Sequence, residues 1–232
     1  MNTPLLLLPG LLCDDDLWSA EVAALAGDCD IVIADMTQDV TISGMASRAV
    51  ARMPETFAVC GLSMGGYTSM EIMRQVPGRV TRLALFDTSP YADPPERIDI
   101  RKALIERVRD GDFEGVTGEH FKTFVHPSRH TDDALMGRIR ASADNVGPDA
   151  YIRQQTAIMG RPDSTDALSK VTCPTLVLCG AEDVMTPPSV HDEMAGMIPG
   201  ATLVKVPGSG HLPTIEKPDE VIRAMRDWLE LA

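Results

Sequence analysis

Ser63 is the residue of this sequence whose surroundings point most directly to chemistry. It is the third residue of GLSMG at residues 61–65, which fits the pattern G-x-S-x-G. An apolar run precedes this motif and a helix-like pattern follows it, the strand–turn–helix context in which the motif exposes a nucleophilic serine. The flanking glycines allow a sharp turn, because side chains there would clash with the adjacent strand and helix. The pattern therefore predicts that Ser63 is lifted above the carboxyl edge of a sheet.

A serine hydroxyl needs a base, and we expect that base to be His211. A neutral imidazole can accept the hydroxyl proton if an acceptor holds its other nitrogen. His211 lies in VPGSGHLPTIEKP, directly after the last apolar run, in a loop expected at the same sheet edge as Ser63. A histidine base also predicts a rate that falls on acidification. The other histidines fall in a helical insert or on a predicted surface helix: His120, His126, His130 and His191.

Two aspartates compete for the place beside the imidazole. Asp183 follows a strand-like run in LVLCGAEDVMTPP and gives the chain order serine, aspartate, histidine. Asp87, at the end of RLALFD, lies at the end of another predicted strand and would also reach the imidazole. Its alternative role is to cap the loop that follows. We expect Asp183 to be the acid, with Asp87 as its competitor and Glu182 behind both.

The loop after the first apolar run is expected to complete an oxyanion hole. One backbone N–H should follow the nucleophile and a second should face it from an early loop. LLLLPGLLCDDDLW supplies such a loop, in which Gly10 permits a tight turn. We therefore pair the N–H of Leu11 with that of Met64, and expect the side chains of both residues to shape the substrate pocket.

These residues need a sheet whose strands end at one edge, and the rest of the chain predicts one. Short apolar runs without polar alternation are typical of strands covered on both faces, and they occur at residues 5–8, 30–35, 57–61, 82–87, 175–180 and 201–206. Amphipathic helix candidates lie between or after them, at residues 17–26, 43–53, 64–75, 189–197 and 219–231. The alternation predicts an α/β fold with a doubly wound, mostly parallel sheet.

The alternation is interrupted once, between Pro90 and about Asp166. This segment is helical in pattern, with amphipathic stretches at residues 96–109, 113–125, 132–145 and 149–159. We expect residues 1–90 and 167–232 to form the core and residues 91–166 to form a helical cap over one edge of the sheet. Tyr91 opens the cap and is a candidate for the pocket wall, whereas Phe121, Phe124, Met136 and Met159 fit internal cap packing better. The cap arginines that a carboxylate-bearing substrate would need are Arg97, Arg138, Arg140, Arg153 and Arg161.

Composition excludes several other classes of protein. The 232 residues carry a formal net charge of −13, which repels nucleic acid and anionic membrane surfaces. No apolar run approaches the roughly 18 residues of a transmembrane helix. The apolar N-terminal segment lacks a basic flank and is broken at Pro9-Gly10, so we expect a strand and not a signal peptide. Five cysteines without regular spacing indicate free thiols in a cytoplasmic protein.

Taken together, these residues resemble the α/β-hydrolase superfamily over nearly the whole chain. The segment GHLPTIEKPDEVIRAMRDWL resembles the small cap-bearing esterases, enol-lactonases and carrier-protein methyl esterases. Pro9 departs from the pattern, since many relatives carry His before the glycine. The resemblance implies a serine hydrolase that forms an acyl-enzyme on Ser63 and cleaves a small-to-medium carboxylic ester or lactone, with no metal or organic cofactor.

Other activities are compatible with the same scaffold. A peroxide-using acyltransferase (a perhydrolase) or a carbon–carbon hydrolase would resemble this chain equally in its Ser63, Asp183 and His211. A ligand receptor with little turnover is the alternative from outside the enzymes. The sequence leaves the natural substrate and the oligomeric state open.

Overall fold

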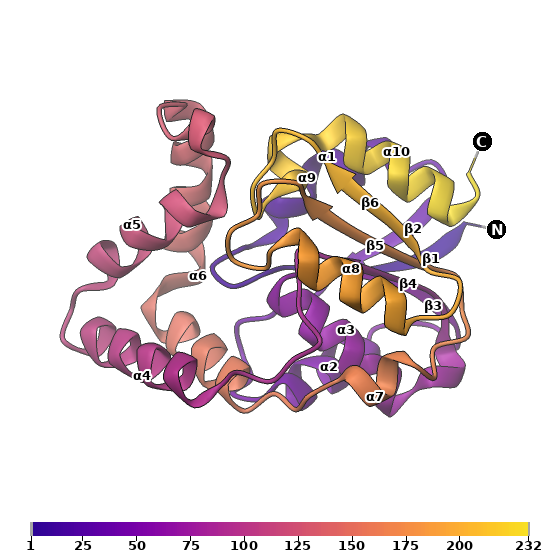
Figure 1. Cartoon of the computed structure of the whole chain (residues 1–232), viewed down its shortest axis with the longest axis horizontal. Helices are drawn as coiled ribbons and strands as arrows, with labels where there is room; N and C mark the ends of the chain where they lie inside the picture. Colours follow the sequence, from indigo (N-terminus) through magenta and orange to yellow (C-terminus); the bar gives the residue numbers. More distant parts are fainter. Residues whose placement is uncertain (1, 232) are drawn as a thin grey trace.

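The computed structural model describes residues 2–231 and contains one six-stranded parallel sheet (Figure 1). The strand order is β2-β1-β3-β4-β5-β6, and every neighbouring pair is parallel. All six predicted strands are present, so the predicted fold class is confirmed. The strands are β1 (Thr3–Leu8), β2 (Cys29–Ile33), β3 (Phe57–Leu62), β4 (Val80–Phe86), β5 (Thr175–Gly180) and β6 (Thr202–Val206).

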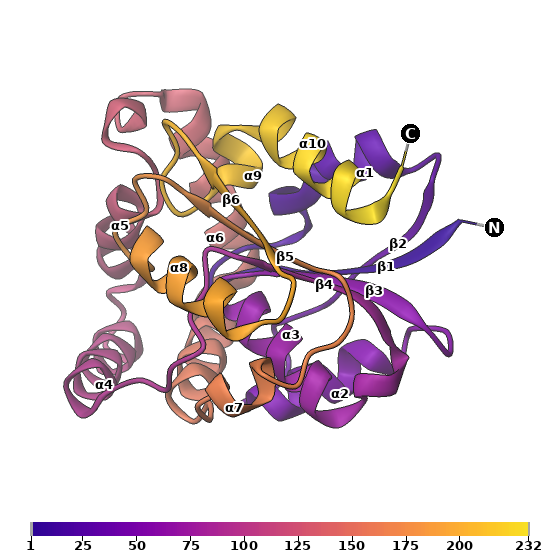
Figure 2. The same ribbon diagram turned by 45° about the vertical axis from the view of Figure 1, so that its right-hand side comes forward.

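Burial explains why the strand runs lack polar alternation. All residues of β3 and β5 are buried, because helices cover the central strands on both faces. Figure 2 shows α1 (Ser19–Leu25), α9 (Pro213–Glu216) and α10 (Pro218–Leu229) on one side of the sheet. The other side carries α2 (Ile42–Val50), α3 (Met64–Gln75), α7 (Thr165–Leu168) and α8 (Pro188–Met197). Short 3-10 helices complete the core: η1 (Asp15–Trp18) and η2 (Pro77–Arg79).

The strand order places a crevice at the site that the sequence predicts. The chain runs outward from β1 to β2, then crosses back over β1 to β3 and continues toward β6. The order therefore reverses between β1 and β3, and ligands of open α/β sheets bind outside the carboxyl ends of strands at such a switch point. The loop after β1 holds Gly10 and Leu11, and the turn after β3 holds Ser63.

Three long helices between β4 and β5 lie beyond the end of the sheet (Figure 1). They are α4 (Pro95–Arg109), α5 (Phe113–Phe124) and α6 (Asp133–Met159), with η3 (Pro127–Arg129) between the last two. The sequence predicts two helices where α6 stands. The structure confirms the interruption: α6 consists of two helical segments that meet at Gly147, which has a φ of 76° and precedes Pro148. Proline disfavours a helical conformation in the residue before it, and glycine takes a positive φ without strain.

Side chains from α6 anchor these helices to the core. Arg138 donates to the carbonyl of Asp16 at 2.7 Å and to the hydroxyl of Ser19 at 2.6 Å, and it also pairs with the Asp16 carboxylate. Gln154 accepts the Leu12 N–H at 3.1 Å. Because Leu12 belongs to the loop after β1, this bond ties the cap to the wall of the crevice.

Two further predictions concern the chain as a whole. All five cysteines are free, as their spacing predicts. Within residues 2–231, each helix is too short or too polar to cross a lipid bilayer.

Glu21 makes stability depend on pH. Its side chain is buried in α1, and neither carboxylate oxygen has a hydrogen-bond partner among the described residues. Burial raises the pKa of Glu21 to about 8, above its ordinary value of 4.5. The unfolded chain loses this proton above pH 4.5 and the folded chain does not, so stability falls as pH rises from about 4.5 to about 8.

We expect Glu21→Gln to gain stability over the wild type as pH rises, by about 1 kcal/mol per pH unit between pH 5 and pH 7.5. Urea unfolding of both proteins in reducing buffer at several pH values measures this difference. Glu55→Gln is the matched control, because it makes the same substitution at an exposed position. A Glu21→Gln difference that does not change with pH would contradict the prediction.

Candidate active site

Ser63 occupies a strained turn between β3 and α3. Its φ is 57° and its ψ is −113°, a left-handed conformation that side chains rarely adopt. Two hydrogen bonds hold the turn: the Ser63 N–H donates to the Phe86 carbonyl at 2.9 Å, and the Ser63 carbonyl accepts from the Thr88 hydroxyl at 2.8 Å. Strain that the surroundings enforce in this way is typical of a functional residue.

The flanking glycines are required by close backbone contact. A Cβ at Gly61 would lie 2.1 Å from the Gly65 carbonyl oxygen, and one at Gly65 would lie 1.9 Å from the Leu8 carbonyl oxygen. Helix α3 therefore packs directly on the backbone of β1 and β3. This packing leaves the Ser63 side chain at the carboxyl edge of the sheet, as the motif predicts.

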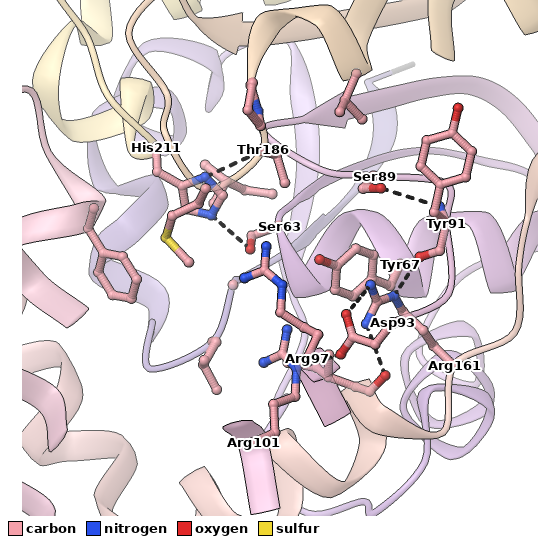
Figure 3. A pocket seen from close by; sticks show the side chains of 18 of the residues that line it. Ser63, Tyr67, Ser89, Tyr91, Asp93, Arg97, Arg101, Arg161, Thr186 and His211 are labelled. Atoms are coloured by element: carbon pink, nitrogen blue, oxygen red, sulfur yellow. Dashed lines mark hydrogen bonds and ion pairs between the residues drawn. The ribbon is translucent and has the colours of Figure 1, made fainter. Parts of the chain in front are cut away.

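His211 and Asp183 come together with Ser63 from distant parts of the chain. His211 Nε2 lies 2.9 Å from Ser63 Oγ (Figure 3), and His211 Nδ1 lies 2.8 Å from Asp183 Oδ2. Both partners of the imidazole–carboxylate pair are almost fully buried, with exposed fractions of 2% for His211 and 3% for Asp183. The three groups form one continuous hydrogen-bonded chain from the hydroxyl to the carboxylate.

Asp183 is held as a carboxylate by four hydrogen bonds. Its Oδ1 accepts from the backbone N–H groups of Met185 and Thr186, and its Oδ2 accepts from the Thr186 hydroxyl and from His211. Burial opposes ionisation, but the charge of His211 and these hydrogen bonds outweigh it and lower the pKa of Asp183 to about 2. The group next to the imidazole therefore carries a negative charge at neutral pH.

The competing acids have other partners. Asp87 is fully buried, its Oδ1 accepts from the Gly180 N–H at 2.9 Å, and its Oδ2 has no partner within residues 2–231. Burial and the nearby charge of Asp183 raise the pKa of Asp87 well above its usual range, which favours the protonated form of this side chain. Glu182 accepts from the N–H groups of Gly208 and Ser209 and braces the loop before His211.

Asp87, Asp183 and His211 also form the group of potential metal ligands in the described part of the chain. Their nearest ligand atoms all lie within 4.8 Å of one another. A metal ion there would have to replace the hydrogen bond between His211 and Asp183 and to ionise Asp87. The arrangement fits a protonated acid beside an imidazole–carboxylate pair better than a metal centre.

The two backbone N–H groups expected to bind an oxyanion, those of Leu11 and Met64, belong to segments that lie next to Ser63. Met64 is the first residue of α3, so its N–H lacks a partner within the helix. The loop with Gly10 passes close by, because a Cβ at Gly10 would lie 3.4 Å from the Ser63 Cβ. Neither the Leu11 N–H nor the Met64 N–H has a hydrogen-bond acceptor in residues 2–231. Both are free to bind a developing negative charge.

Glu216 supports the base and was given no role in the sequence analysis. Its carboxylate accepts from the Gly210 N–H at 2.7 Å, the His126 N–H at 2.8 Å and the Ser209 hydroxyl at 3.2 Å. It thereby fixes the loop that carries His211 against the end of α5. The sequence offered one indication of this role: Glu216 is the acidic residue of IEKP and follows His211 by only five residues.

His191 is buried, contrary to the expectation that it lies on a surface helix. None of its side chain is exposed, and it packs beneath the site. Its Nε2 accepts the Thr88 N–H at 3.1 Å, and its Nδ1 lies 3.3 Å from the Pro187 carbonyl, to which it donates. Burial lowers the pKa of His191 to about 4, so the ring is neutral. Its spacing of three residues from the buried Met194 was the signal that this helix face points inward.

A cavity of about 280 Å³ opens over Ser63 between the core and the cap. The side chains of Leu11, Leu62, Met185 and Val190 line its core side, and Phe124 and Ile158 line its cap side. Of the four apolar cap residues weighed in the sequence analysis, Phe124 alone is in this lining. Tyr91 also lines the cavity, but its hydroxyl reaches away to Glu193 of α8.

The parallel sheet, the strained serine turn and the buried imidazole–carboxylate pair define an α/β hydrolase. The model of the alpha/beta hydrolase family matches residues 5–224, and the chain belongs to this family. It is 26% identical over 222 residues to a pimeloyl-[acyl-carrier protein] methyl ester esterase of Neisseria meningitidis, covering 92% of this chain and 84% of that one. The corresponding esterase of Nitrosomonas europaea is 28% identical over 178 residues, which cover 74% and 70% of the two chains.

Solved structures of other hydrolases share the fold of this chain. A thermophilic esterase from Thermogutta terrifontis with malate bound superposes with a TM-score of 0.92 at 29% identity, covering 99% of this chain and 90% of the esterase. An enol-lactonase from Burkholderia xenovorans LB400 shares the fold, with a TM-score of 0.88 at 21% identity over 99% of this chain and 92% of the lactonase. The chain is thus a hydrolase from a family that includes enzymes that cleave carboxylic esters.

Proposed function

We propose that this protein hydrolyses small-to-medium carboxylic esters or lactones through an acyl-enzyme on Ser63. The observation that carries the proposal is the hydrogen-bonded chain from Ser63 Oγ through His211 to Asp183, with distances of 2.9 and 2.8 Å, at the floor of the cavity between the core and the cap. The methyl ester esterases and the thermophilic esterase to which the chain is similar support the same chemistry.

In the first half of the reaction, Ser63 Oγ attacks the ester carbonyl carbon while its proton passes to His211 Nε2. The carbonyl oxygen becomes an oxyanion, which the N–H groups of Leu11 and Met64 bind. The carboxylate of Asp183 keeps Nδ1 protonated and stabilises the imidazolium that forms. Collapse of the intermediate breaks the bond to the alcohol, which leaves with the proton from Nε2.

In the second half, water takes the place of the alcohol. His211 Nε2 accepts a proton from the water as it attacks the acyl carbon, and the second tetrahedral intermediate uses the same two N–H groups. Its collapse returns the proton to Ser63 Oγ and releases the carboxylic acid. Each step needs only groups that already surround Ser63.

The direct test is hydrolysis of p-nitrophenyl acetate, butyrate and octanoate, combined with mass spectrometry of the quenched enzyme. We expect turnover that depends on acyl length, because the cavity limits the acyl group, and an acylated peptide that contains Ser63. Product analysis in the presence of peroxide or of an acceptor alcohol separates hydrolysis from acyl transfer. Turnover without any acylated Ser63 peptide after rapid quenching, or no turnover of any ester, would refute the proposal.

A further inference from the structure

The cavity over Ser63 contains a buried ion-pair network beside the catalytic residues. Asp93 lies at its centre, with a side chain that is 3% exposed. Its Oδ1 pairs with Arg161 at 2.8 Å and its Oδ2 pairs with Arg101 at 2.6 Å. Both carboxylate oxygens are therefore already engaged by a guanidinium.

The two arginines of this network are held by other groups as well. Arg161 donates to the carbonyls of Tyr91 and Ile158 at 3.1 Å each, and its guanidinium lies 4.1 Å from the centre of the Tyr67 ring. Arg101 donates to Gln155 Oε1 at 2.6 Å. These contacts make Arg101 and Arg161 structural members of the cavity wall, where their charge is partly neutralised by Asp93.

Arg97 differs from them in having no partner for its guanidinium within residues 2–231. It lines the same cavity from α4, and Figure 3 shows its side chain extending toward Ser63. Arg97 makes no ion pair with Asp93, whose two carboxylate oxygens pair with Arg101 and Arg161. In a chain with a net charge of −13, an arginine that faces the cavity without a carboxylate partner leaves a local positive charge opposite the nucleophile.

The other cap arginines that the sequence analysis left open are committed elsewhere. Arg138 binds Asp16 and Ser19, and Arg153 donates to the carbonyl of Thr37 at 2.7 Å. Arg140 lies over the Phe121 ring and near Glu114. None of these three lines the cavity, so the structure reduces the five candidates to Arg97 and the paired Arg161.

We propose that the natural substrate carries a carboxylate in addition to its ester or lactone group, and that Arg97 binds this carboxylate while the scissile carbonyl lies at Ser63. The inference rests on the proposed ester hydrolysis and names its substrate class. A planar guanidinium binds a carboxylate through two parallel N–H···O bonds.

The test compares esters that differ only in the carboxylate. Mono-p-nitrophenyl glutarate against p-nitrophenyl pentanoate places the charge on the acyl part. The acetyl ester of 4-hydroxybutanoate against butyl acetate places it on the alcohol part. We expect kcat/KM of the wild type to favour the charged ester in at least one pair by about tenfold or more, because charge-assisted hydrogen bonds from a guanidinium to a bound carboxylate are worth about one to two orders of magnitude.

Arg97→Met should reduce that preference at least about tenfold, and Arg97→Glu should reverse it. Arg109→Met is the matched control: Arg109 is on the same helix and loses the same charge, but it pairs with Glu106 outside the cavity, so the preference should persist. Hydrolysis of the neutral esters without any charge preference, or a preference that Arg97→Met leaves intact, would overturn this inference and leave ester hydrolysis standing.

A binding measurement separates this inference from the proposed reaction. Calorimetric titration of the Ser63→Ala protein with monomethyl glutarate requires no turnover. Binding that weakens about tenfold in Ser63→Ala/Arg97→Met supports the carboxylate contact even if no ester is hydrolysed, in which case the proposed function alone fails. Equal binding by the two proteins, or binding by neither, contradicts the role of Arg97.

Discussion

Ser63→Ala will lower kcat for ester hydrolysis by about 10⁴-fold or more. Removal of Oγ eliminates the atom that forms the acyl-enzyme, so the remaining rate comes from the oxyanion hole and binding alone. Alanine keeps the Cβ of serine, so the strained φ of 57° and the two backbone hydrogen bonds of the turn persist. The effect should therefore appear in activity and leave the unfolding temperature nearly unchanged.

Single-turnover kinetics with p-nitrophenyl butyrate measure this effect without interference from product release. Ser69→Ala is the matched control, because Ser69 is also in α3 and its hydroxyl donates to the Gly65 carbonyl, but it does not line the cavity. We expect it to retain activity within about tenfold. A Ser63→Ala enzyme with more than a hundredth of the wild-type rate would mean that Ser63 is not the nucleophile.

Asp183→Asn will lower kcat by about 10³-fold or more, whereas Asp87→Asn will lower it by less than about tenfold. An amide at position 183 no longer supplies the charge that stabilises the imidazolium, and it favours the wrong tautomer of His211. Burial raises the pKa of Asp87 and favours its protonated form, and an amide of the same shape preserves the acceptor for the Gly180 N–H. The two substitutions are chemically identical and differ only in position.

The measurement is kcat of both variants on the same ester, together with their unfolding temperatures. Each variant serves as the control for the other, because each removes one carboxyl group from the same buried cluster. The opposite ranking would assign the acid to the end of β4. Equal losses in both variants would mean that the two carboxyl groups act as one unit on His211.

Local sequence patterns could not decide which of these two aspartates contacts His211. Asp87 and Asp183 both lie between Ser63 and His211 in the chain, and both follow apolar strands whose carboxyl ends lie at one edge of the sheet. The chain order serine, aspartate, histidine therefore fits either residue. The choice depends on which carboxyl group accepts hydrogen bonds from Met185, Thr186 and His211. Those partners belong to loops whose paths no local pattern specifies.

The amino-acid sequence by itself determined the class of fold, the six strands and the helical insert, and it predicted the serine, aspartate and histidine that the structure brings together. These features are local: apolar periodicity defines strands and helices, and glycines around Ser63 permit one kind of turn. Tertiary structure alone decided that His191 is buried, that the pKa of Asp87 is raised and that Arg97 is the cavity arginine without a partner among the described residues. Burial and ion pairing join residues far apart in the chain, such as Asp93 with Arg161, and therefore follow from packing and not from any segment read alone.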